Sequence, residues 1–475
     1  MQQDPLQQSI KQQPSPQPAE PKSAHRLAGI SSMVGTTIEW YDFFIYGAAA
    51  ALIFNKLFFP NLDPLSGVLA AFATYAVGFI GRPLGGIVFG HFGDKVGRKS
   101  MLLLTLMMMG IPTVLIGLLP TYETIGYWAA FGLVLLRFIQ GMAMGGEWGG
   151  AVLMAVEHAP EGKKGFWGSL PQASTGGGLM LASVALWLVS LLPEPILFSW
   201  GWRIPFIASI LLLAVGWYIR VKVPESPDFE KVKQQAKAIK VPAVQVLQQH
   251  PKKVLRIIIA RAAENAWFYL ASTFTLAYTT TQLAIERSSI LFATICGAVL
   301  IMIMTPLCGH LSDKVGQRRM FIFGLCLLAA YAYPFFYLLN SQDPLWVWVA
   351  IVIAIGMIFP MMYAPQSQLF ARQFPAQIRY SGISISVQFA GVLGGGLAPM
   401  IATKLLSLGG GSPHLISSYI AGMAVIAIFA ALAMPRDVLG QQNAVPTDED
   451  LLLAHTANES VAKPALHKSR LKPDS

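Results

Sequence analysis

Two acidic residues lie in an apolar stretch near the start of the chain, where charged side chains are costly. Glu39 and Asp42 are three residues apart and Tyr46 follows four residues later, so a helix would present all three on one face. If that helix enters a membrane near Leu27, a rise of about 1.5 Å per residue places both acids roughly 18–22 Å along it, near the middle. Carboxyl groups at such a depth are typical proton carriers, because a proton removes the costly charge.

A base of comparable depth lies in a later apolar stretch. Arg137 is about 11–13 residues into that stretch, or roughly 16–20 Å, and Gln140 follows on its face. An acid and a guanidinium at matching depth can act as a proton switch, because their separation decides how readily the acid takes up a proton. We therefore predict proton coupling through Asp42, Glu39 and Arg137. The alternative is an ion pair that only fixes the order of the helices.

Two further bases interrupt apolar stretches. Arg82 lies within GFIGRPLGGIVFG, and Arg261 is three residues before Glu264, with which it can pair along one helix. Buried guanidinium groups favour an anionic ligand, since their geometry suits a carboxylate, although Arg82 is equally a candidate gate residue. Each predicted ligand-binding side chain could instead be a hydrogen bond between helices. These side chains are Arg137, Tyr41, Tyr46, Gln140, Gln172, Arg261, Asn265, Tyr269, Tyr363, Gln366 and Gln388.

The composition explains why these charges stand out. The 475 residues are 54% hydrophobic and 12% charged, with a mean hydropathy of +0.53. Soluble domains are about a quarter charged. Apolar runs of about twenty residues, long enough to cross a bilayer, recur from Leu27 to Met434. A polytopic helical membrane protein is therefore predicted.

Twelve membrane-spanning helices are expected. Their approximate ranges are 27–55, 67–91, 100–119, 124–152, 165–192, 200–221, 254–281, 288–311, 319–339, 344–370, 378–408 and 414–434. An even number leaves both termini on one side, and the links on that side hold most of the lysine and arginine, which predicts that both termini are cytoplasmic. This asymmetry also accounts for the net charge of +10 without a nucleic-acid partner.

A polar motif occurs twice and divides the chain. GHFGDKVGRK at 90–99 returns as GHLSDKVGQRR at 309–319, each between two apolar runs, where a short polar link is expected. Positive charge on one side of a membrane explains the lysines and arginines but not the repeated order, so duplicated halves are predicted. The expected parts are a tail (1–26), a six-helix half (27–222), a linker (223–253), a second six-helix half (254–434) and a second tail (435–475).

Other sites are not indicated by the sequence. Cys296, Cys308 and Cys326 lack metal-ligand spacing with each other or with histidine, so no metal is expected. A nucleotide-binding P-loop and catalytic-triad spacing are also absent from the sequence, so we expect no cofactor and no enzymatic activity. Gly141, Gly145 and Gly149 recur every fourth residue and predict a smooth face for close helix packing, with substrate contact as the alternative.

Four longer blocks resemble a known family. The blocks are IEWYDFFIYG at 38–47, the segment from Gly81 to Lys99, RFIQGMAMGGEWGGA at 137–151 and SWGWRIPF at 199–206. Together they resemble the metabolite:proton symporter family of the major facilitator superfamily, and the repeated motif resembles the loop motif of that superfamily. The resemblance implies a fold of twelve transmembrane helices in two six-helix bundles.

The resemblance also implies roles for individual residues. Asp42 would be the coupling acid, with Glu39 as the alternate, and Arg137 would occupy the coupling position. Asp94 would brace a closed cytoplasmic gate, with Arg98 and Lys99 in the gate loop. The predicted gate residues are, in full, Arg82, Gly90, Asp94, Arg98, Lys99, Asp313 and Arg318. The second copy departs from the first because Gln317 stands where the first has Arg98.

The expected function is inward, proton-coupled transport of a small organic acid across a bacterial inner membrane, by a monomer. The expected partners are therefore an organic anion, protons and the lipid bilayer. One alternative is a proton-coupled antiporter or efflux carrier, although SLPQASTGGGL at 169–179 lacks the glycine-proline pattern of proton antiporters. Another is a zwitterion symporter of the proline/betaine type. A sensor would need a folded signalling domain, and neither the tails nor the linker predicts one.

Overall fold

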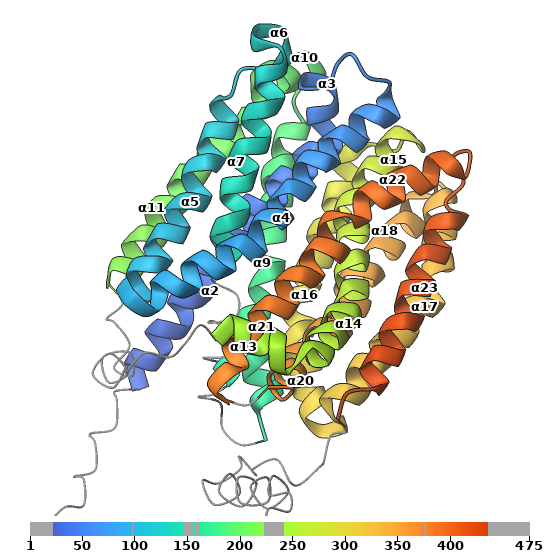
Figure 1. Ribbon diagram of the computed structural model, residues 1–475. Coiled ribbons are helices and arrows are strands. Elements are labelled where there is room, and N and C mark those ends of the chain that lie inside the picture. Colours follow the sequence, from blue (N-terminus) through green and yellow to red (C-terminus); the bar gives the residue numbers. More distant parts are fainter. Residues whose placement is uncertain are drawn as a thin grey trace, which may run out of the picture.

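Long apolar runs separated by short turns fold as helices throughout the described chain, and that part of the protein contains no strand. The structure is a computed structural model, and it describes residues 22–96, 98–145, 155–156, 159, 162–222, 242–374 and 376–435. Twelve long helical segments run through these ranges and lie roughly side by side (Figure 1).

The first six segments form one bundle. They are α2 (Lys22–Ala49) continued by η2 (Ala50–Phe54) and α3 (Asn55–Leu57), α4 (Pro64–Val96), α5 (Arg98–Leu118), α7 (Tyr127–Gly145), α9 (Lys164–Ser190), and α10 (Glu194–Ile196) with η3 (Leu197–Gly201) and α11 (Arg203–Lys222). The short helix α6 (Tyr122–Ile125) precedes α7.

The last six segments form the other bundle. They are α14 (Pro251–Tyr269) with η4 (Leu270–Phe274) and α15 (Thr275–Thr281), α16 (Arg287–Val315), α17 (Gln317–Asn340), α18 (Pro344–Ile353) with η5 (Ala354–Ile358), α19 (Phe359–Tyr363) and α20 (Gln366–Ala371), α21 (Ala376–Ala390) with η6 (Gly391–Gly396) and α22 (Ala398–Leu408), and α23 (His414–Leu432). A short helix, α13 (Pro242–Gln249), stands before them.

Length and composition identify most of these segments as able to span a membrane. Eight helices among the described residues are long and apolar enough to cross a bilayer, or nine if Glu194–Gly201 and Arg203–Tyr218, bent by 44°, count as one. Large apolar side chains such as Phe131, Leu211 and Phe429 point outward, as lipid contact requires. The predicted all-α membrane fold with two six-helix bundles is confirmed.

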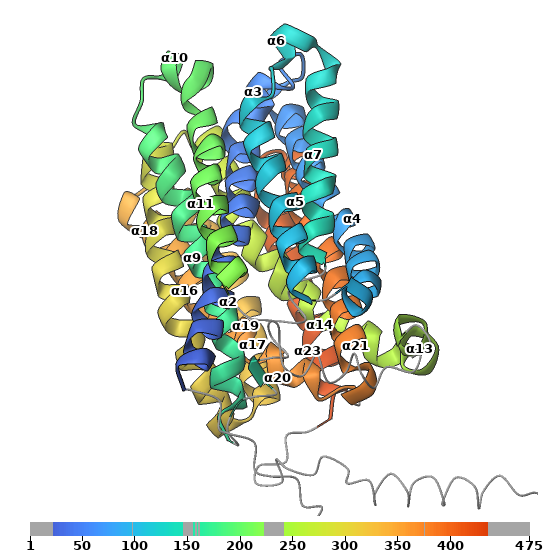
Figure 2. The ribbon, with the colours of Figure 1, turned by 90° about the vertical axis from the view of Figure 1, so that its left-hand side faces the viewer.

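The two bundles meet along α9 and α16. The described chain begins and finishes at one end of the molecule, which is here called the terminal end (Figure 2). Near that end, Gly165 of α9 and Gly309 of α16 face each other. Further along, Gly176 leaves room for the carbonyl of Ala298. At the opposite end, here called the distal end, Arg287 of α16 pairs with Glu194 of α10 at 3.3 Å. Contacts of α9 and α10 with α16 therefore hold the two bundles together at the terminal end, in the middle and at the distal end.

The repeated motif is more helical than expected. Instead of the short polar link predicted at 90–99, α4 continues to Val96 and α5 begins at Arg98. The second copy behaves in the same way, because α16 runs to Val315 and α17 begins at Gln317. Gly316 between them has φ of 98°, a conformation that glycine adopts without strain. A single residue can therefore reverse the chain, and the polar residues extend the helices beyond their apolar stretches.

Several other predicted boundaries differ by a few residues from the structure, and two of them show the reason. The first helix begins at Lys22 rather than at residue 27, and α14 begins at Pro251 rather than at 254. Both helices extend past their apolar stretch because polar residues also adopt helical structure. Most of the predicted tails and linker (1–21, 223–241 and 436–475) lies outside the described residues.

Glycines allow α7 to approach α4 backbone to backbone. A Cβ added at Gly141 would overlap the backbone of Gly78, and one at Gly145 would overlap the backbone of Arg82. The predicted packing role of Gly141 and Gly145 is therefore confirmed, while Gly149 lies outside the described residues. The contact fixes α7, and hence Arg137, against α4.

Replacing Gly141 with alanine should destabilise the protein by about 1–3 kcal/mol, because the methyl group forces two backbones apart. The measurement is thermal unfolding of the purified protein in detergent. Gly422→Ala is the matched control, since Gly422 is also helical but a Cβ there meets no atom within 4 Å. An equal loss in both variants would mean that the close approach contributes nothing.

Candidate functional site

Arg137 is fully buried in the first bundle and surrounded by aromatic rings. Its guanidinium carbon lies 4.1, 4.4 and 4.7 Å from the ring centres of Phe43, Tyr46 and Tyr75. Nη1 donates a hydrogen bond to Oε1 of Gln140 at 3.2 Å. Nε and Nη2 have no hydrogen-bond partner among the described residues. Two nitrogen atoms of a buried cation therefore have N–H groups available to an acceptor.

Asp42 lies close to this cation, as the sequence predicted. It is 1% exposed, within electrostatic reach of Arg137 and beside the hydroxyl of Thr113, which accepts a hydrogen bond from Gln140 at 2.7 Å. Its Oδ1 has no hydrogen-bond partner in the described part of the chain. Glu39, three residues earlier, is buried as well. The structure thus brings the predicted acid and base together through a polar group from α5 that the sequence did not indicate.

Arg82 lies where the two bundles meet. Its guanidinium carbon is 4.3 Å from the ring centre of Phe43 and 4.4 Å from that of Phe79. Nη2 donates to Sδ of Met144 at 3.3 Å, and the side chain also reaches the hydroxyl of Tyr269 in the second bundle. Because Tyr269 belongs to α14, Arg82 joins the charged site of the first bundle to the second bundle.

One phenyl ring is shared by both cations. Phe43, directly after Asp42, is fully buried and contacts Arg82 and Arg137 as well as Tyr75, Phe79 and Tyr269. The sequence did not single out Phe43, Tyr75, Phe79 or Thr113. The aromatic run around Asp42 was the available signal, but the contacts come from different helices, whose pairing a helical period does not reveal.

A second polar cluster lies in the other bundle. Arg261 donates from Nη1 to Oε1 of Gln366, and Nε2 of Gln366 donates to Oε2 of Glu264 at 3.0 Å. The sequence predicted a pair between Arg261 and Glu264, and the structure places the amide of Gln366 between them. Nearby, the hydroxyl of Tyr363 lies 3.3 Å from that of Thr175, across the two bundles.

The remaining predicted ligand-binding residues are divided between the interface and the bundle interior. Gln172 on α9 is almost fully buried, and neither its amide oxygen nor its nitrogen has a hydrogen-bond partner in the described structure. Gln388 donates to the carbonyl of Gly145 across the bundles at 3.2 Å. Asn265 packs beside Gly394.

Two predicted tyrosines bond within the first bundle. The hydroxyl of Tyr41 donates to the carbonyl of Pro205 at 2.7 Å, and that of Tyr46 donates to Thr74 at 2.7 Å. Tyr46 still contacts Arg137 through its ring, whereas Tyr41 points toward α11.

The second copy of the motif joins the bundles at the terminal end. Asp313 accepts hydrogen bonds from the backbone N–H groups of Gly165 at 2.7 Å and Phe166 at 3.0 Å, at the start of α9. A carboxylate is favourable at the N-terminus of a helix. Arg318 lies elsewhere and donates to the carbonyl of Leu432 at 2.5 Å, at the end of α23. The side chains of Gly90, Asp94, Arg98 and Lys99 lie outside the described residues.

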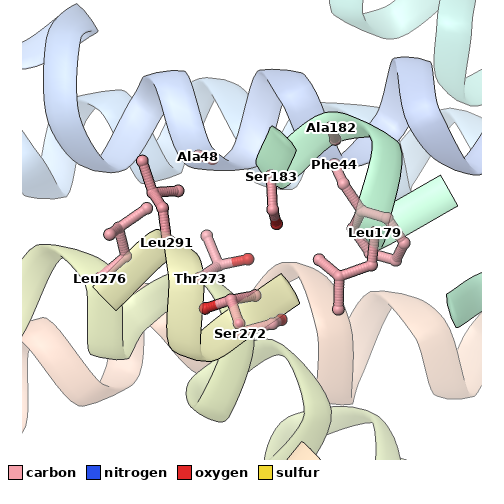
Figure 3. A pocket seen from close by; sticks show the side chains of 10 residues that line it. Phe44, Ala48, Leu179, Ala182, Ser183, Ser272, Thr273, Leu276 and Leu291 are labelled. Carbon is pink, nitrogen blue, oxygen red and sulfur yellow. The ribbon is translucent and has the colours of Figure 1, made fainter. Parts of the chain in front are cut away.

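A small cavity lies between the bundles (Figure 3). Its volume of about 10 Å³ is enough for about one water molecule. Figure 3 shows Ser183 of α9 facing Thr273 of η4 across it, with Phe44 and Leu179 beside them. The two bundles are therefore in close contact around this cavity, with little space between them. The described residues include no group of three or more histidine, cysteine, aspartate or glutamate side chains that could hold a metal ion.

Comparison with known proteins agrees with this arrangement. The sequence model of the Major Facilitator Superfamily matches residues 32–399, with a further match over 263–470. The shikimate transporter of Escherichia coli (strain K12) is 41% identical over 415 residues, covering 87% of this chain and 95% of the relative. The proline/betaine transporter of the same strain is 32% identical over 421 residues, covering 86% of this chain and 83% of the relative.

Solved structures give the same fold. The crystal structure of a D-xylose-proton symporter superposes with a TM-score of 0.69 at 18% identity, covering 86% of this chain and 98% of the symporter. These relatives are transporters and not enzymes. The chain is therefore a multi-pass secondary transporter that belongs to the major facilitator superfamily, in which it resembles the metabolite:proton symporters.

Proposed function

We propose that this transporter carries a small organic acid, a mono- or dicarboxylate, inward together with protons across the bacterial inner membrane. The observation that carries the proposal is the charged site inside the first bundle, which Arg82 connects to the second bundle. Arg137 and Arg82 have unpaired N–H groups, and Asp42, within electrostatic reach of Arg137, has an unpaired carboxyl oxygen. A guanidinium binds a carboxylate with two parallel hydrogen bonds, so these donors suit an organic anion.

The charge balance of this site suggests the order of events. Protonation neutralises Asp42 and leaves Arg137 without its neighbouring anion. The carboxylate of the substrate then takes the available N–H groups of Arg137. When the bundles rock and the site opens inward, the substrate leaves and the proton follows, which restores the attraction between Asp42 and Arg137. A buried cation therefore always faces one negative charge, either from the protein or from the substrate.

The similarity to the shikimate transporter supports a carboxylate as the substrate, with shikimate as the first compound to test. A second candidate is a zwitterion, because relatives also include a proline/betaine transporter. Both kinds of substrate carry a carboxylate that Arg137 could bind. Only the second adds a cation, which the nearby Arg82 would repel.

The test is uptake into proteoliposomes that contain the purified protein. Radiolabelled shikimate, α-ketoglutarate, citrate, proline and glycine betaine are compared, with the outside either more acidic than the inside or at equal pH. We expect an acidic outside to accelerate the uptake of one of the carboxylates, and a protonophore to remove that acceleration. Uptake whose rate is the same with and without the proton gradient would exclude symport. Faster uptake of proline than of the carboxylates would favour a zwitterion as the substrate.

We further propose that the gate at the terminal end is closed by Asp313 and that both termini are cytoplasmic. Asp313→Asn removes the charge from the start of α9, and we expect the terminal end to open more often. Losing about 1–2 kcal/mol changes such an equilibrium about 5- to 30-fold. In a background without native cysteines, labelling of Ser169→Cys, which is buried beside Gly309, should increase accordingly.

The control for this variant is Asp343→Asn. Asp343 also accepts a backbone N–H at a helix start, from Leu345 at 2.9 Å, but within its own segment. Labelling should stay at the level of the parent protein. If Asp313→Asn leaves labelling unchanged as well, Asp313 does not hold the gate.

A further inference from the structure

Phe43 occupies an unusual place for a phenylalanine, because two guanidinium groups rest against its ring. The guanidinium carbons of Arg137 and Arg82 lie 4.1 and 4.3 Å from the ring centre. The face of an aromatic ring is electron-rich and attracts cations, most strongly where water is excluded. Phe43 is fully buried, so both contacts are made without competing water.

The other ring contacts place the two cations at different heights along α2. Arg137 contacts Tyr46, three residues after Phe43, whereas Arg82 is 5.9 Å from Trp40, three residues before it. Residues three apart lie nearly one helical turn apart. Phe43 therefore lies at a level between two like charges that repel each other.

The contacts on α4 give the same order. Arg137 contacts Tyr75 and Arg82 contacts Phe79, one turn further along that helix. Tyr75 and Phe79 each also pack against Phe43, with ring centres 5.1 Å away. The contacts on α2 and those on α4 therefore both show that Phe43 is the common neighbour of the two cations.

Phe43 directly follows the acid Asp42 in the chain, so the two residues move together. A shift of α2 that follows a change of charge on Asp42 therefore moves the Phe43 ring with it. Arg82 rests on that ring and reaches Tyr269 of the second bundle. We propose that Phe43 is a positioning residue that passes the charge state of Asp42 to Arg82, and through Arg82 to the contact between the bundles. This role rests on the proposed proton coupling through Asp42.

Asp42 has few other titratable or charged neighbours that could take over this task. Segments 101–118 of α5, 165–190 of α9 and 204–217 of α11, which pack around α2, contain none. Among the titratable and charged groups, Arg137 of α7 and Tyr41 of α2 interact electrostatically with Asp42. The others nearby are Glu39, three residues before Asp42 on α2, and the groups that interact with Arg137, which are Tyr46, Tyr75, Arg82 and Tyr269.

The test follows the contact between the bundles without any substrate. Hydrogen–deuterium exchange of the α14–η4 peptide that contains Tyr269 is measured in nanodiscs at several pH values and corrected for intrinsic exchange. Phe43→Leu and Phe43→Met keep apolar volume without a ring, and Phe43→Tyr keeps the ring. Phe54→Leu is the matched control, because Phe54 is also fully buried in the first segment and packed against other rings, but no guanidinium contacts its ring in the described part of the chain.

We expect the exchange of this peptide to depend on pH in the wild type and to lose that dependence in Asp42→Asn. In Phe43→Leu and Phe43→Met the pH-dependent change should shrink by about threefold or more, consistent with the strength of a buried cation–ring contact. Phe43→Tyr and Phe54→Leu should keep it. Thermal unfolding identifies any variant that is merely misfolded, and Phe43→Met then replaces Phe43→Leu.

Two results would overturn the role of Phe43. One is a wild-type peptide whose exchange does not respond to pH. The other is Phe43→Leu or Phe43→Met with a full response. Uptake of labelled shikimate by the wild type is measured separately in proteoliposomes. A protein that transports no carboxylate contradicts the proposed function. The hydrogen-exchange experiment contains no substrate, so its result tests the role of Phe43 separately.

Discussion

Arg137→Lys should reduce uptake of the organic acid at least about a hundredfold, equivalent to about 3 kcal/mol. Lysine keeps the positive charge but has no planar fork, so it cannot offer two parallel hydrogen bonds to a carboxylate. Its ammonium group is also more strongly hydrated, which makes burial among Phe43, Tyr46 and Tyr75 more costly. The measurement is the initial rate of labelled shikimate uptake into proteoliposomes under an inward proton gradient.

Arg203→Lys provides the comparison. Arg203 donates from Nη1 to the carbonyls of Gly117 at 2.8 Å and Leu119 at 2.7 Å, at the distal end and away from the charged site. A lysine there should preserve most of the uptake, because an ammonium group can still donate to carbonyls. If uptake in Arg137→Lys stays within about threefold of the wild type, about 0.7 kcal/mol, two-pronged binding of the carboxylate by Arg137 is wrong.

Asp42→Asn should abolish uptake driven by the proton gradient while leaving exchange of substrate across the membrane. An amide has nearly the shape of the carboxyl group, but it neither takes up nor releases a proton. Arg137 then lacks its neighbouring anion permanently, so substrate still binds, but the proton gradient can no longer drive net movement. We expect gradient-driven uptake to fall at least about a hundredfold. Exchange of labelled for unlabelled shikimate at equal pH should remain and should no longer depend on pH.

Asp63→Asn is the control for the loss of a carboxylate. Hydrogen bonds, first from the Ser66 side chain and then from its backbone N–H, hold the pKa of Asp63 below its usual range, and the side chain lies in the exposed loop before α4. Because its pKa is lowered, Asp63 stays ionised throughout a pH range of about 5–8 and contributes nothing to pH dependence there. Uptake in this variant should match the wild type. Equal losses in both variants would remove Asp42 from the coupling step.

Much of the charged site could be predicted because burial leaves a trace in the sequence. A charge within an apolar run is conspicuous, and helical rise alone put Asp42 and Arg137 at matching depths. The contacts between helices could not be predicted in this way. Phe43 is one of many phenylalanines in apolar surroundings, and only the packing of α2, α4 and α7 places two cations against it. Gln366 was predicted as a ligand-binding group, and its place between Arg261 and Glu264 depends on packing in the same way.

The fold was predictable for a similar reason. Hydropathy along the chain gave the number and approximate limits of the helices, because each must cover the thickness of a bilayer. Hydropathy does not report where a helix ends once it has left the membrane, so α4 and α16 continue through residues that were expected to form a link. The reversal at Gly316 depends on one backbone angle, for which glycine is permissive but not diagnostic.

A polar contact joins the two bundles at each end of α16, one to the start of α9 and one to α10, and the two contacts differ in their exposure to solvent. Asp313 is held by backbone N–H groups where α9 begins, whereas the Glu194 side chain in the pair with Arg287 is 65% exposed. Dissolved ions screen an exposed pair readily, and such a pair contributes only about 0–1 kcal/mol. High ionic strength therefore loosens the distal contact first. We therefore expect a salt titration to favour opening of the distal end over opening of the terminal end without any change in the sequence.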